Sequence, residues 1–223
     1  MHAPRSGACG CMRQWNVAQL TLFESGDRIL ENDERGRIAY TPRFVDAATA
    51  ASWFAELRAG VRWRETRREM YDREVTVPRL VAHFWLDSPS GDTPQAIVAA
   101  AARVTTHLSV PFNAVGLNLY RDGRDSVAPH NDHLTELREG FPIALVSLGA
   151  TRRMTIRAKT PPRRTTHIDL EPGSLFIMDY LTQLHYTHGV PKTHEPVGER
   201  ISLAFRVKPD RNISDTRSNG PCK

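Results

Sequence analysis

The second half of the chain restricts the fold most, because after Pro111 it is divided into short runs with strand character. Glycine, proline or charged turns separate these runs, and no internal repeat is visible. Short β-type runs bounded by turn residues are typical of antiparallel sheets. The runs are Ala114 to Tyr120, Ile143 to Leu148, Met154 to Arg157, Thr165 to Leu170, Ser174 to Met178 and Ile201 to Val207. They predict a barrel or a double-sheet jelly roll.

Two helices are predicted before Pro111. The first follows Asp46, a residue type that caps helices, and ends at Gly60. The second is capped by Thr93, has Pro94 in its first turn, and carries apolar residues at helical spacing, namely Ile97, Ala101, Val104 and Leu108. We therefore predict an α+β fold that is mainly β, with the helices packed outside the jelly roll.

A strand that begins at Glu74 and ends in His83, Phe84 and Trp85 is also expected between these helices, with a break at Pro78 because proline cannot donate to a sheet ladder. Nearby, the stretch VRWRETRRE places Trp63 among several arginines. Basic residues around an aromatic ring can form a nucleic-acid groove. A solvated charged face with one buried tryptophan is the alternative, and the pattern leaves both open.

Composition indicates one globular domain between two polar ends. The chain has 223 residues, of which 40% are hydrophobic and 25% charged, so it can bury a core. We expect a disordered leader over residues 1–14, one domain over 15–208 and a disordered tail over 209–223. A net charge of +5 favours an anionic partner such as nucleic acid, although a mild basic excess is common elsewhere.

The three cysteines, Cys9, Cys11 and Cys222, form neither a disulfide framework nor a cysteine-based zinc set. They fit a reducing, cytoplasmic setting. No apolar run is long enough to cross a membrane, so no membrane partner is expected. The sequence contains no indication of an oligomer, and a monomer is favoured.

The segment His130-Asn131-Asp132 is a candidate metal site. Residues two apart on a strand point to the same side, so His130 and Asp132 can bind the same metal ion. His188 is the best candidate for a third ligand, because it follows a β-run and precedes Gly189. Two histidines and one carboxylate form the facial triad of non-haem Fe(II). The same ligands with a water molecule could also form a hydrolytic zinc centre.

Two arginines distinguish these alternatives. Arg200 and Arg206 lie six residues apart on a predicted strand and hence on one face. An arginine near an open metal site is suited to bind the far carboxylate of a dicarboxylate co-substrate. Asn118 and Tyr120 can add hydrogen bonds from their own strand. Such a set is needed by an iron oxygenase and not by a zinc hydrolase.

Taken in order, these residues resemble the AlkB family of Fe(II)/2-oxoglutarate-dependent dioxygenases. The resemblance lies in N-x-Y-x-x-G-x-x-x-x-x-x-H-x-D, then H, then R-x-x-x-x-x-R. The matching residues are Asn118, Tyr120, Gly123, His130, Asp132, His188, Arg200 and Arg206. The stretches PIALVSLGATRRMTIRAK and PGSLFIMDYLTQLHYTHGVPK also resemble the family. The similarity covers roughly residues 53 to 208, and the combined motif is highly specific.

The resemblance implies a double-stranded β-helix with Fe(II) held by the three metal ligands, which would be the only catalytic residues. Residues 15–112 would supply an N-terminal extension, a lid and helices, and residues 113–208 the jelly-roll core. Arg200 and Tyr120 would bind the distal carboxylate of 2-oxoglutarate. Asn118 and Arg206 would lie near the chelating end of the co-substrate, and Ser202 would also belong to its site.

The implied activity is oxidative demethylation of N-alkylated nucleobases in DNA or RNA. Oxygen and 2-oxoglutarate would be consumed, and formaldehyde, succinate and CO2 released. The alternative is a 2-oxoglutarate-dependent hydroxylase or demethylase of a protein side chain or a small metabolite. A third alternative, a non-catalytic nucleic-acid-binding module, fits poorly with an intact metal motif.

The implied substrate contacts are Arg73, Phe84, Trp85, His133 and Arg153. Phe84 or Trp85 would stack on a flipped base, and a basic groove beside the iron would comprise Arg67, Arg68, Arg152, Arg153 and Arg157.

The chain departs from the family pattern at several positions. Ser202 and Ala204 stand where Asn and Thr are usual, and His133 stands where many members have an acidic residue. The segment LDSPSGDTP replaces the usual lid stretch, so the lid is expected to be shorter or different.

Overall fold

The computed structural model describes residues 26–70, 73–89 and 91–209, except for the side chains of residues 68–76. The predicted leader and residues 210–223 of the predicted tail lie outside this part. The strands are β1 (Arg28–Asp33), β2 (Gly36–Thr41), β3 (Arg64–Met70), β4 (Arg73–Trp85), β5 (Ala114–Tyr120), β6 (Val127–His130), β7 (Ile143–Gly149), β8 (Arg152–Ala158), β9 (Thr165–Leu170), β10 (Leu175–Met178), β11 (Tyr186–Val190) and β12 (Arg200–Arg206). The helices are α1 (Ala47–Gly60), α2 (Gln95–Leu108) and α3 (Thr182–His185), with a 3-10 turn η2 (Leu134–Glu136).

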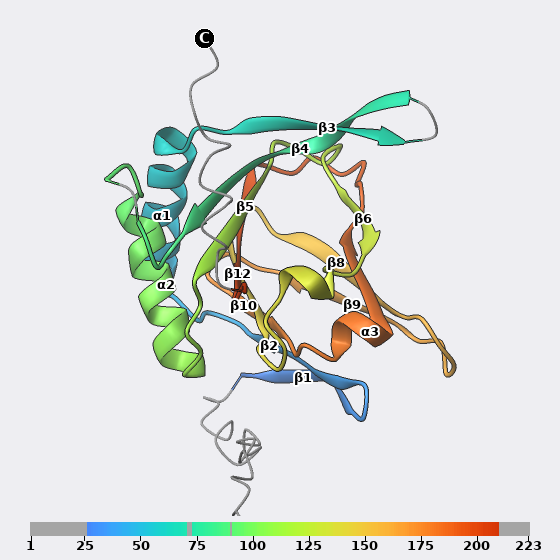
Figure 1. Cartoon of the computed structure of the whole chain (residues 1–223). Coiled ribbons are helices and arrows are strands. Elements are labelled where there is room, and N and C mark those ends of the chain that lie inside the picture. Colours follow the sequence, from blue (N-terminus) through green and yellow to red (C-terminus); the bar gives the residue numbers. More distant parts are fainter. Residues whose placement is uncertain (1–25, 71–72, 90, 210–223) are drawn as a thin grey trace, which may run out of the picture.

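The strands form two antiparallel sheets that face each other, as Figure 1 shows. The larger sheet has eight strands in the order β1-β2-β10-β7-β12-β5-β4-β3, and the smaller has four in the order β6-β11-β8-β9. The neighbours β10-β7-β12-β5 in the large sheet and β6-β11-β8 in the small sheet are not consecutive in the sequence, as in a jelly roll. The predicted fold class is therefore confirmed. Within the described residues, no helix is long and apolar enough to cross a membrane.

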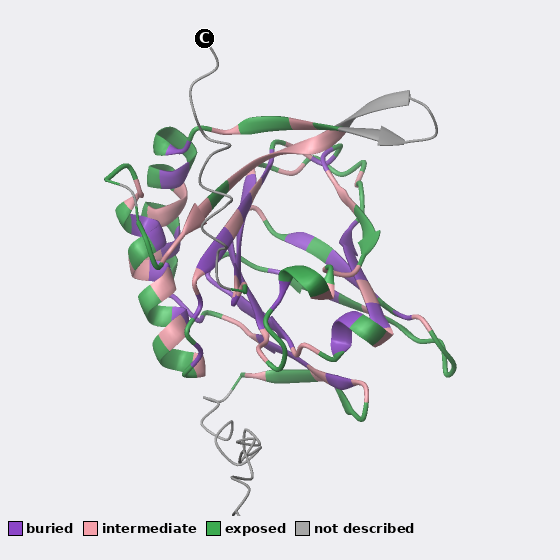
Figure 2. Ribbon diagram, viewed as in Figure 1, coloured by how far each residue is buried: buried purple, intermediate pink, exposed green. Residues whose placement is uncertain are grey.

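Alternate residues of strands β5 and β12 point to opposite faces of the large sheet, and each face belongs to a different apolar core. Leu117 and Leu203 pack with residues of α1 and α2 in a core on the outer face of the large sheet. Tyr120 and Ala204 belong to a second core, between the two sheets. This period of two places one set of side chains under the helices and the other inside the jelly roll. Figure 2 shows the buried residues along these central strands.

The two long helices begin close to the predicted positions. The Asp46 carboxylate accepts a hydrogen bond of 2.8 Å from the Thr49 N–H and so caps α1. Helix α2 begins at Gln95, and Pro94 takes the extended cap position that was predicted for Thr93. Pro94 provides no side-chain cap, but the Ala96 N–H in the first turn donates to Oε1 of Glu56 on α1 at 3.0 Å. The buried residues of α2 are Ala96, Ile97, Ala100 and Val104.

The predicted break at Pro78 does not occur, because β4 continues for 13 residues through this proline. The register between β3 and β4 shifts between Glu65 and Arg67, opposite the proline, and a β-bulge of this kind accommodates a missing donor. The carbonyl of Pro78 accepts a hydrogen bond of 2.8 Å from the Ser126 N–H. Strand β4 is thereby joined to the loop before β6, next to the predicted metal ligands.

Candidate active site

The pairing of β6 with β11 places His130 directly opposite His188. Their ring centroids are 4.4 Å apart. Asp132 follows β6, and one ligand atom from each of the three residues lies within 4.8 Å of the others. The structure therefore brings together the three predicted metal ligands, which are separated by up to 58 residues (188 − 130) in the sequence.

Close strand pairing at this point depends on Gly189. A Cβ atom at this position would lie 2.7 Å from the carbonyl oxygen of Val127 and 3.0 Å from the nitrogen of Pro129. Any larger residue would push β6 away from β11. Glycine is therefore required for the two histidines to approach each other.

The His130 ring is oriented by the backbone. Its Nδ1 lies 3.0 Å from the carbonyl oxygen of Ala128, which can only accept, so Nδ1 carries the proton in this contact. The lone pair of Nε2 is then available to a metal ion. This Nε2 lies 3.8 Å from Oδ1 of Asp132.

His188 is only 7% exposed. Burial, together with the nearby His130, lowers the pKa of the His188 imidazole to about 3. The ring is therefore neutral at physiological pH, which is the form that binds metal ions.

Asp132 is held by two contacts, one to its carboxylate and one to its backbone. Its Oδ2 accepts a hydrogen bond of 2.6 Å from Nε of Arg206, and its backbone N–H donates to Oε1 of Gln183 at 2.9 Å. Burial acts to raise the pKa of Asp132, but the charge and hydrogen bond of Arg206 outweigh it and keep this pKa below its usual value. Asp132 is thus an ionised ligand in a defined orientation.

Gln183 was not found by sequence reasoning. It lies on α3, is 1% exposed, and its amide also donates to Oγ1 of Thr182 at 3.1 Å. A lone glutamine five residues before His188 has no ligand-like pattern that would identify it.

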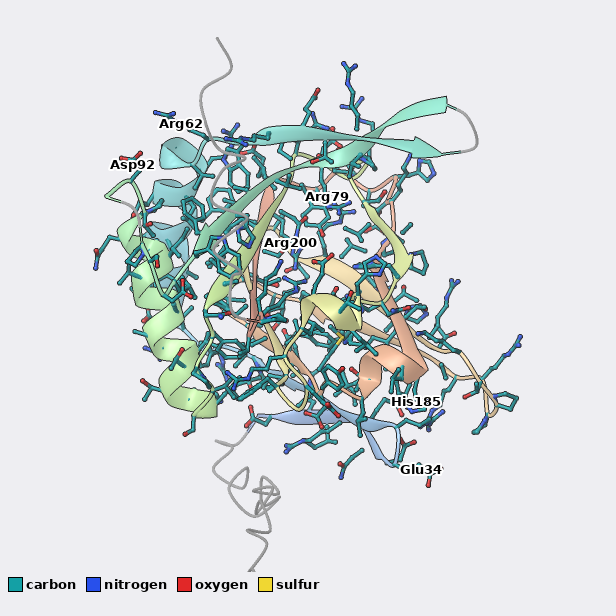
Figure 3. All side chains as sticks on the ribbon, viewed as in Figure 1. Glu34, Arg62, Arg79, Asp92, His185 and Arg200 are labelled. Atoms are coloured by element: carbon teal, nitrogen blue, oxygen red, sulfur yellow. The ribbon has the colours of Figure 1, made fainter. Side chains whose placement is uncertain are left out.

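Arg200 is completely buried, on the face of β12 that carries Ser202 and Ala204. Its Nη2 donates to Oγ of Ser147 at 2.9 Å, and its guanidinium lies 5.1 Å from the centre of the Tyr120 ring. Nε and Nη1 have no hydrogen-bond partner among the described residues. Burial lowers the pKa of Arg200. Figure 3 shows Arg200 in the interior, whereas Arg62 lies at the periphery.

A buried cation with two unpartnered N–H groups is costly unless a ligand satisfies it. A carboxylate matches these donors in charge and geometry. The residues present therefore fit a dicarboxylate such as 2-oxoglutarate, and the neutral histidines with an ionised aspartate fit Fe(II).

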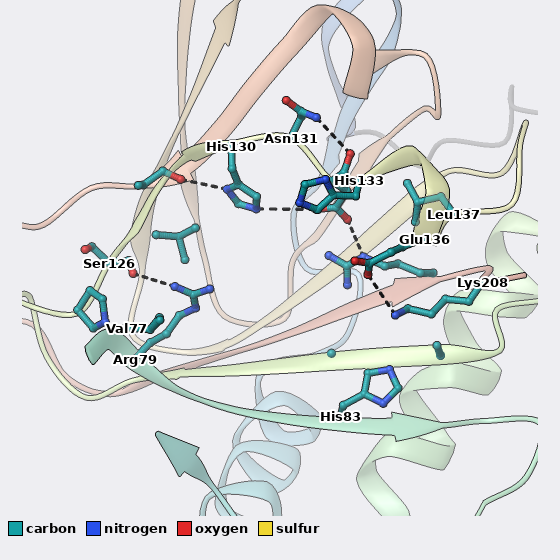
Figure 4. Close-up of a pocket in the computed structure, with 17 residues that line it drawn as sticks. Val77, Arg79, His83, Ser126, His130, Asn131, His133, Glu136, Leu137 and Lys208 are labelled. Carbon is teal, nitrogen blue, oxygen red and sulfur yellow. Dashed lines mark hydrogen bonds and ion pairs between the residues drawn. The ribbon is translucent and has the colours of Figure 1, made fainter. Parts of the chain in front are cut away.

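Two cavities meet at the metal cluster. The larger has a volume of about 490 Å³ and the smaller about 230 Å³. Both are lined by Arg79, Gly116, Val127, His130 and Arg206. Asn118, Tyr120, His188 and Ser202 line only the smaller cavity. His83, Asp132, His133, Glu136 and Lys208 line only the larger one, which Figure 4 shows.

Of the predicted co-substrate residues, Asn118, Tyr120, Ser202 and Arg206 line the smaller cavity, whereas Arg200 does not line it and lies against the Tyr120 ring. Asn118 Nδ2 lies 3.4 Å from Oγ of Ser202 on the paired strand β12. Arg79, which sequence reasoning missed, donates through Nε to Oδ1 of Asn118 at 2.7 Å. A charged residue inside the apolar run VPRLVA was the signal that could have identified it.

Only one of the predicted substrate residues lies at a cavity in the described part of the chain. His133 lines the larger cavity. Trp85 lies on the same face of β4 as His83, with ring centroids 5.3 Å apart, and Lys208 Nζ is 5.9 Å from the Trp85 ring. Phe84 points to the other face and packs against the core under the helices. Neither aromatic residue lines one of the two cavities, so the predicted stacking on a base remains a prediction.

The predicted basic groove is not formed as expected. Arg152 is 3% exposed and donates to the carbonyl groups of Asp122, Asp125 and Pro191 at 2.8 to 2.9 Å. Arg152 therefore links the loop before β6 to the segment after β11 from inside the protein. Arg153 is exposed and forms a two-point ion pair with Asp169.

The other predicted arginines are either exposed or have side chains outside the described part of the chain. Arg67 and Arg157 are exposed, on β3 and β8. The side chains of Arg68 and Arg73 lie outside the described part, so their predicted contacts remain predictions.

The fold, the metal cluster and the arginine pocket together define an iron- and 2-oxoglutarate-dependent oxygenase. Residues 37–206 match the family model of the 2OG-Fe(II) oxygenase superfamily, and the chain belongs to this superfamily. It is therefore an oxidoreductase that uses Fe(II), 2-oxoglutarate and O2.

Within the superfamily the chain is AlkB-like. It is 31% identical over 192 residues to the alpha-ketoglutarate-dependent dioxygenase alkB homolog 3 of Bos taurus, covering 78% of this chain and 67% of the relative. It is 34% identical over 125 residues to the DNA oxidative demethylase ALKBH2 of Homo sapiens, covering 51% and 48%. The solved structure of OsALKBH1 has a similar fold, with a TM-score of 0.53 and 15% identity over 81% of this chain and 100% of that one.

Proposed function

We propose that this protein demethylates N-alkylated nucleobases in DNA or RNA by oxidation. The observation that carries the proposal is the pair of cavities that meet at His130 and Arg206. One cavity leads towards a buried arginine and suits a dicarboxylate, and the other is within the usual size range of small-molecule sites. The relatives named as alkB homolog 3 and ALKBH2 support a nucleic-acid substrate.

In this proposal His130, Asp132 and His188 hold Fe(II). Arg200 and Tyr120 bind the distal carboxylate of 2-oxoglutarate, and Asn118 and Ser202 line its site. Arg206 was predicted to lie near the chelating end of the co-substrate. Because its Nε is bonded to Asp132, we assign it the further task of orienting this ligand.

When bound, the iron centre supplies oxygen activation coupled to decarboxylation of 2-oxoglutarate. One oxygen atom of O2 enters succinate and the other is inserted into a C–H bond of the N-methyl group. The resulting N-hydroxymethyl group loses formaldehyde as its N–C bond breaks and its hydroxyl proton moves to the ring nitrogen. The base must leave the stack to reach the larger cavity, which His83, on the same face of β4 as Trp85, lines.

The second candidate is a 2-oxoglutarate-dependent hydroxylase or demethylase of a protein side chain or small metabolite. The engagement of Arg152 and Arg153 within the protein favours it, because these arginines do not extend a basic groove. A cytoplasmic location and a monomeric state complete the proposal, on the basis of the cysteine content and the mild basic charge.

A formaldehyde-release screen tests the proposal. The protein with Fe(II) and 2-oxoglutarate would be incubated with methylated single-stranded oligonucleotides, their unmethylated counterparts and a methylated peptide. We expect formaldehyde only from methylated oligonucleotides, and none with the His130→Ala or Asp132→Ala variant. Release from the peptide alone would favour the second candidate. Normal succinate formation by both variants would refute the metal assignment.

A further inference from the structure

The short helix α3 takes part in a network of hydrogen bonds that ends at the metal ligand Asp132. Gln183 accepts a hydrogen bond from the backbone N–H of Asp132 through Oε1 at 2.9 Å, and its Nε2 donates to Oγ1 of Thr182 at 3.1 Å. The Thr182 hydroxyl donates in turn to the backbone carbonyl of Asp179 at 2.6 Å. Thr182 and Gln183 are each 1% exposed, so the network is shielded from bulk water.

The direction of each hydrogen bond in this network follows from its two ends. The carbonyl of Asp179 can only accept, so the single proton of the Thr182 hydroxyl is committed to it. The hydroxyl then offers only lone pairs to Gln183, and it can pair only with the amide nitrogen. The amide oxygen therefore faces the N–H of Asp132, which can only donate. A reversed amide would bring two N–H groups together at Asp132 and two acceptors together at Thr182.

Thr182 provides the stronger of the two acceptors that hold the amide nitrogen of Gln183. The other acceptor is Sδ of Met178 at 3.9 Å, and a thioether sulfur accepts only weakly. Without the hydroxyl, little would oppose a reversed amide at this end of the side chain. The orientation that supplies an acceptor to Asp132 therefore depends on Thr182.

The backbone of this region is anchored separately from the network. The N–H of Asp179 donates to the carbonyl of Arg37 on β2 at 3.0 Å, and the Asp179 carboxylate accepts from the Arg37 N–H at 3.0 Å. At the other end, Nζ of Lys159 donates to the backbone carbonyl of Gln183 at 2.8 Å. Removal of the Thr182 hydroxyl should therefore change the orientation of the amide and leave α3 in place.

We propose that Thr182 is a positioning residue for the metal centre, because its hydroxyl selects the orientation of the Gln183 amide and thereby supplies the acceptor that holds Asp132. Thr182 lines neither cavity, so it acts through Gln183. The inference concerns the metal cluster, which both candidate functions share. Its failure would leave the proposed function standing.

Titration with Co(II) tests this inference. Thr182→Val removes the hydroxyl with little change in shape and should weaken Co(II) binding about tenfold, the lower end of the range for outer partners of metal ligands. Thr182→Ser keeps the hydroxyl and should bind Co(II) as the wild type does. An unchanged affinity in Thr182→Val, or an equal loss in Thr182→Ser, would overturn the proposal.

Thr166→Val is the matched control. It also removes a threonine hydroxyl, one that donates to Oε1 of the buried Glu31 at 3.0 Å on the edge strand β9. We expect this variant to have a lower melting temperature and the Co(II) affinity of the wild type. A loss of Co(II) affinity equal to that of Thr182→Val would attribute both effects to general destabilisation and overturn the proposal.

A double-mutant cycle with Gln183→Glu separates amide orientation from a purely structural role of the hydroxyl. Both oxygens of a carboxylate accept, so this background has no orientation to select. Adding Thr182→Val to Gln183→Glu should therefore change the Co(II) affinity by less than about twofold, as for independent sites. A loss of about tenfold in both backgrounds would show that Thr182 does not act through the amide, and the proposal would be wrong.

Discussion

The guanidinium of Arg206 holds one oxygen of the Asp132 carboxylate, with Nε 2.6 Å from Oδ2. The other oxygen, Oδ1, faces Nε2 of His130 at 3.8 Å. The arginine is fixed in turn, because its Nη1 donates to the carbonyl of Ala204 at 3.0 Å. One carboxylate oxygen is therefore held in an internal ion pair, while the other faces the position where the metal ligands converge.

Arg206→Lys should weaken metal binding although it conserves the charge. A lysine cannot donate to both Asp132 and the carbonyl of Ala204 in a fixed plane. Loss of an outer contact of this kind lowers metal affinity about 10- to 100-fold. Titration with Co(II), followed by visible absorption, would measure this change. Arg153→Lys alters an exposed ion pair and should retain wild-type affinity. Equal affinities for both variants would refute the role of Arg206.

Gln183→Leu should lower both stability and metal affinity, because it leaves the buried N–H of Asp132 without its acceptor. Such a loss costs about 1–3 kcal/mol of unfolding free energy. Chemical denaturation and the same Co(II) titration would show both effects. Gln183→Glu keeps an acceptor oxygen and should recover most of the metal affinity. If the two variants bind metal alike, Gln183 does not position Asp132.

Arg200→Met should raise the melting temperature of the protein without 2-oxoglutarate and remove the stabilisation that 2-oxoglutarate provides. The buried guanidinium has two unpartnered N–H groups, and an apolar replacement of a buried charge can stabilise by about 1–4 kcal/mol. Thermal unfolding with and without 2-oxoglutarate measures both quantities.

Arg152→Met is the matched comparison for this experiment, because Arg152 also lies over the Tyr120 ring, at 5.6 Å. Its guanidinium satisfies three carbonyl groups, so this change should lower the melting temperature. Destabilisation of both variants to the same extent would contradict the assignment of Arg200 as a ligand-binding cation.

Gly189→Ala should separate the two histidines. The added Cβ would meet the Val127 carbonyl at 2.7 Å, which requires β6 to move away from β11. We expect a folded protein with strongly reduced Co(II) affinity, since a metal site tolerates only small errors in ligand position. Gly198→Ala meets its nearest neighbour at 3.8 Å, an ordinary contact, and serves as the control. A wild-type Co(II) affinity in Gly189→Ala would show that the metal site does not depend on the close pairing of β6 with β11.

Much of the fold and the metal cluster could be predicted because they depend on local periodicity. The alternation along β5 and β12 already separates Asn118 and Tyr120 from the residues under the helices. In the same way, the spacing of His130 and Asp132 follows from the geometry of one short segment. The runs after Pro111 were correctly located for the same reason, with the boundaries of β5 and β9 correct and those of β7, β8, β10 and β12 wrong by one or two residues.

Contacts between distant segments could not be predicted in this way. Alternation shows that Phe84 and Trp85 face opposite sides of β4, but only the packing of α1 and α2 decides that Phe84 enters the core. Arg152 and Arg153 are adjacent in the sequence, yet one is buried and braces two loops while the other is exposed. Gln183 and Arg206 reach Asp132 from 51 and 74 residues away. Local pattern determines which face a side chain occupies, whereas the partner on that face depends on how the sheets and loops pack together.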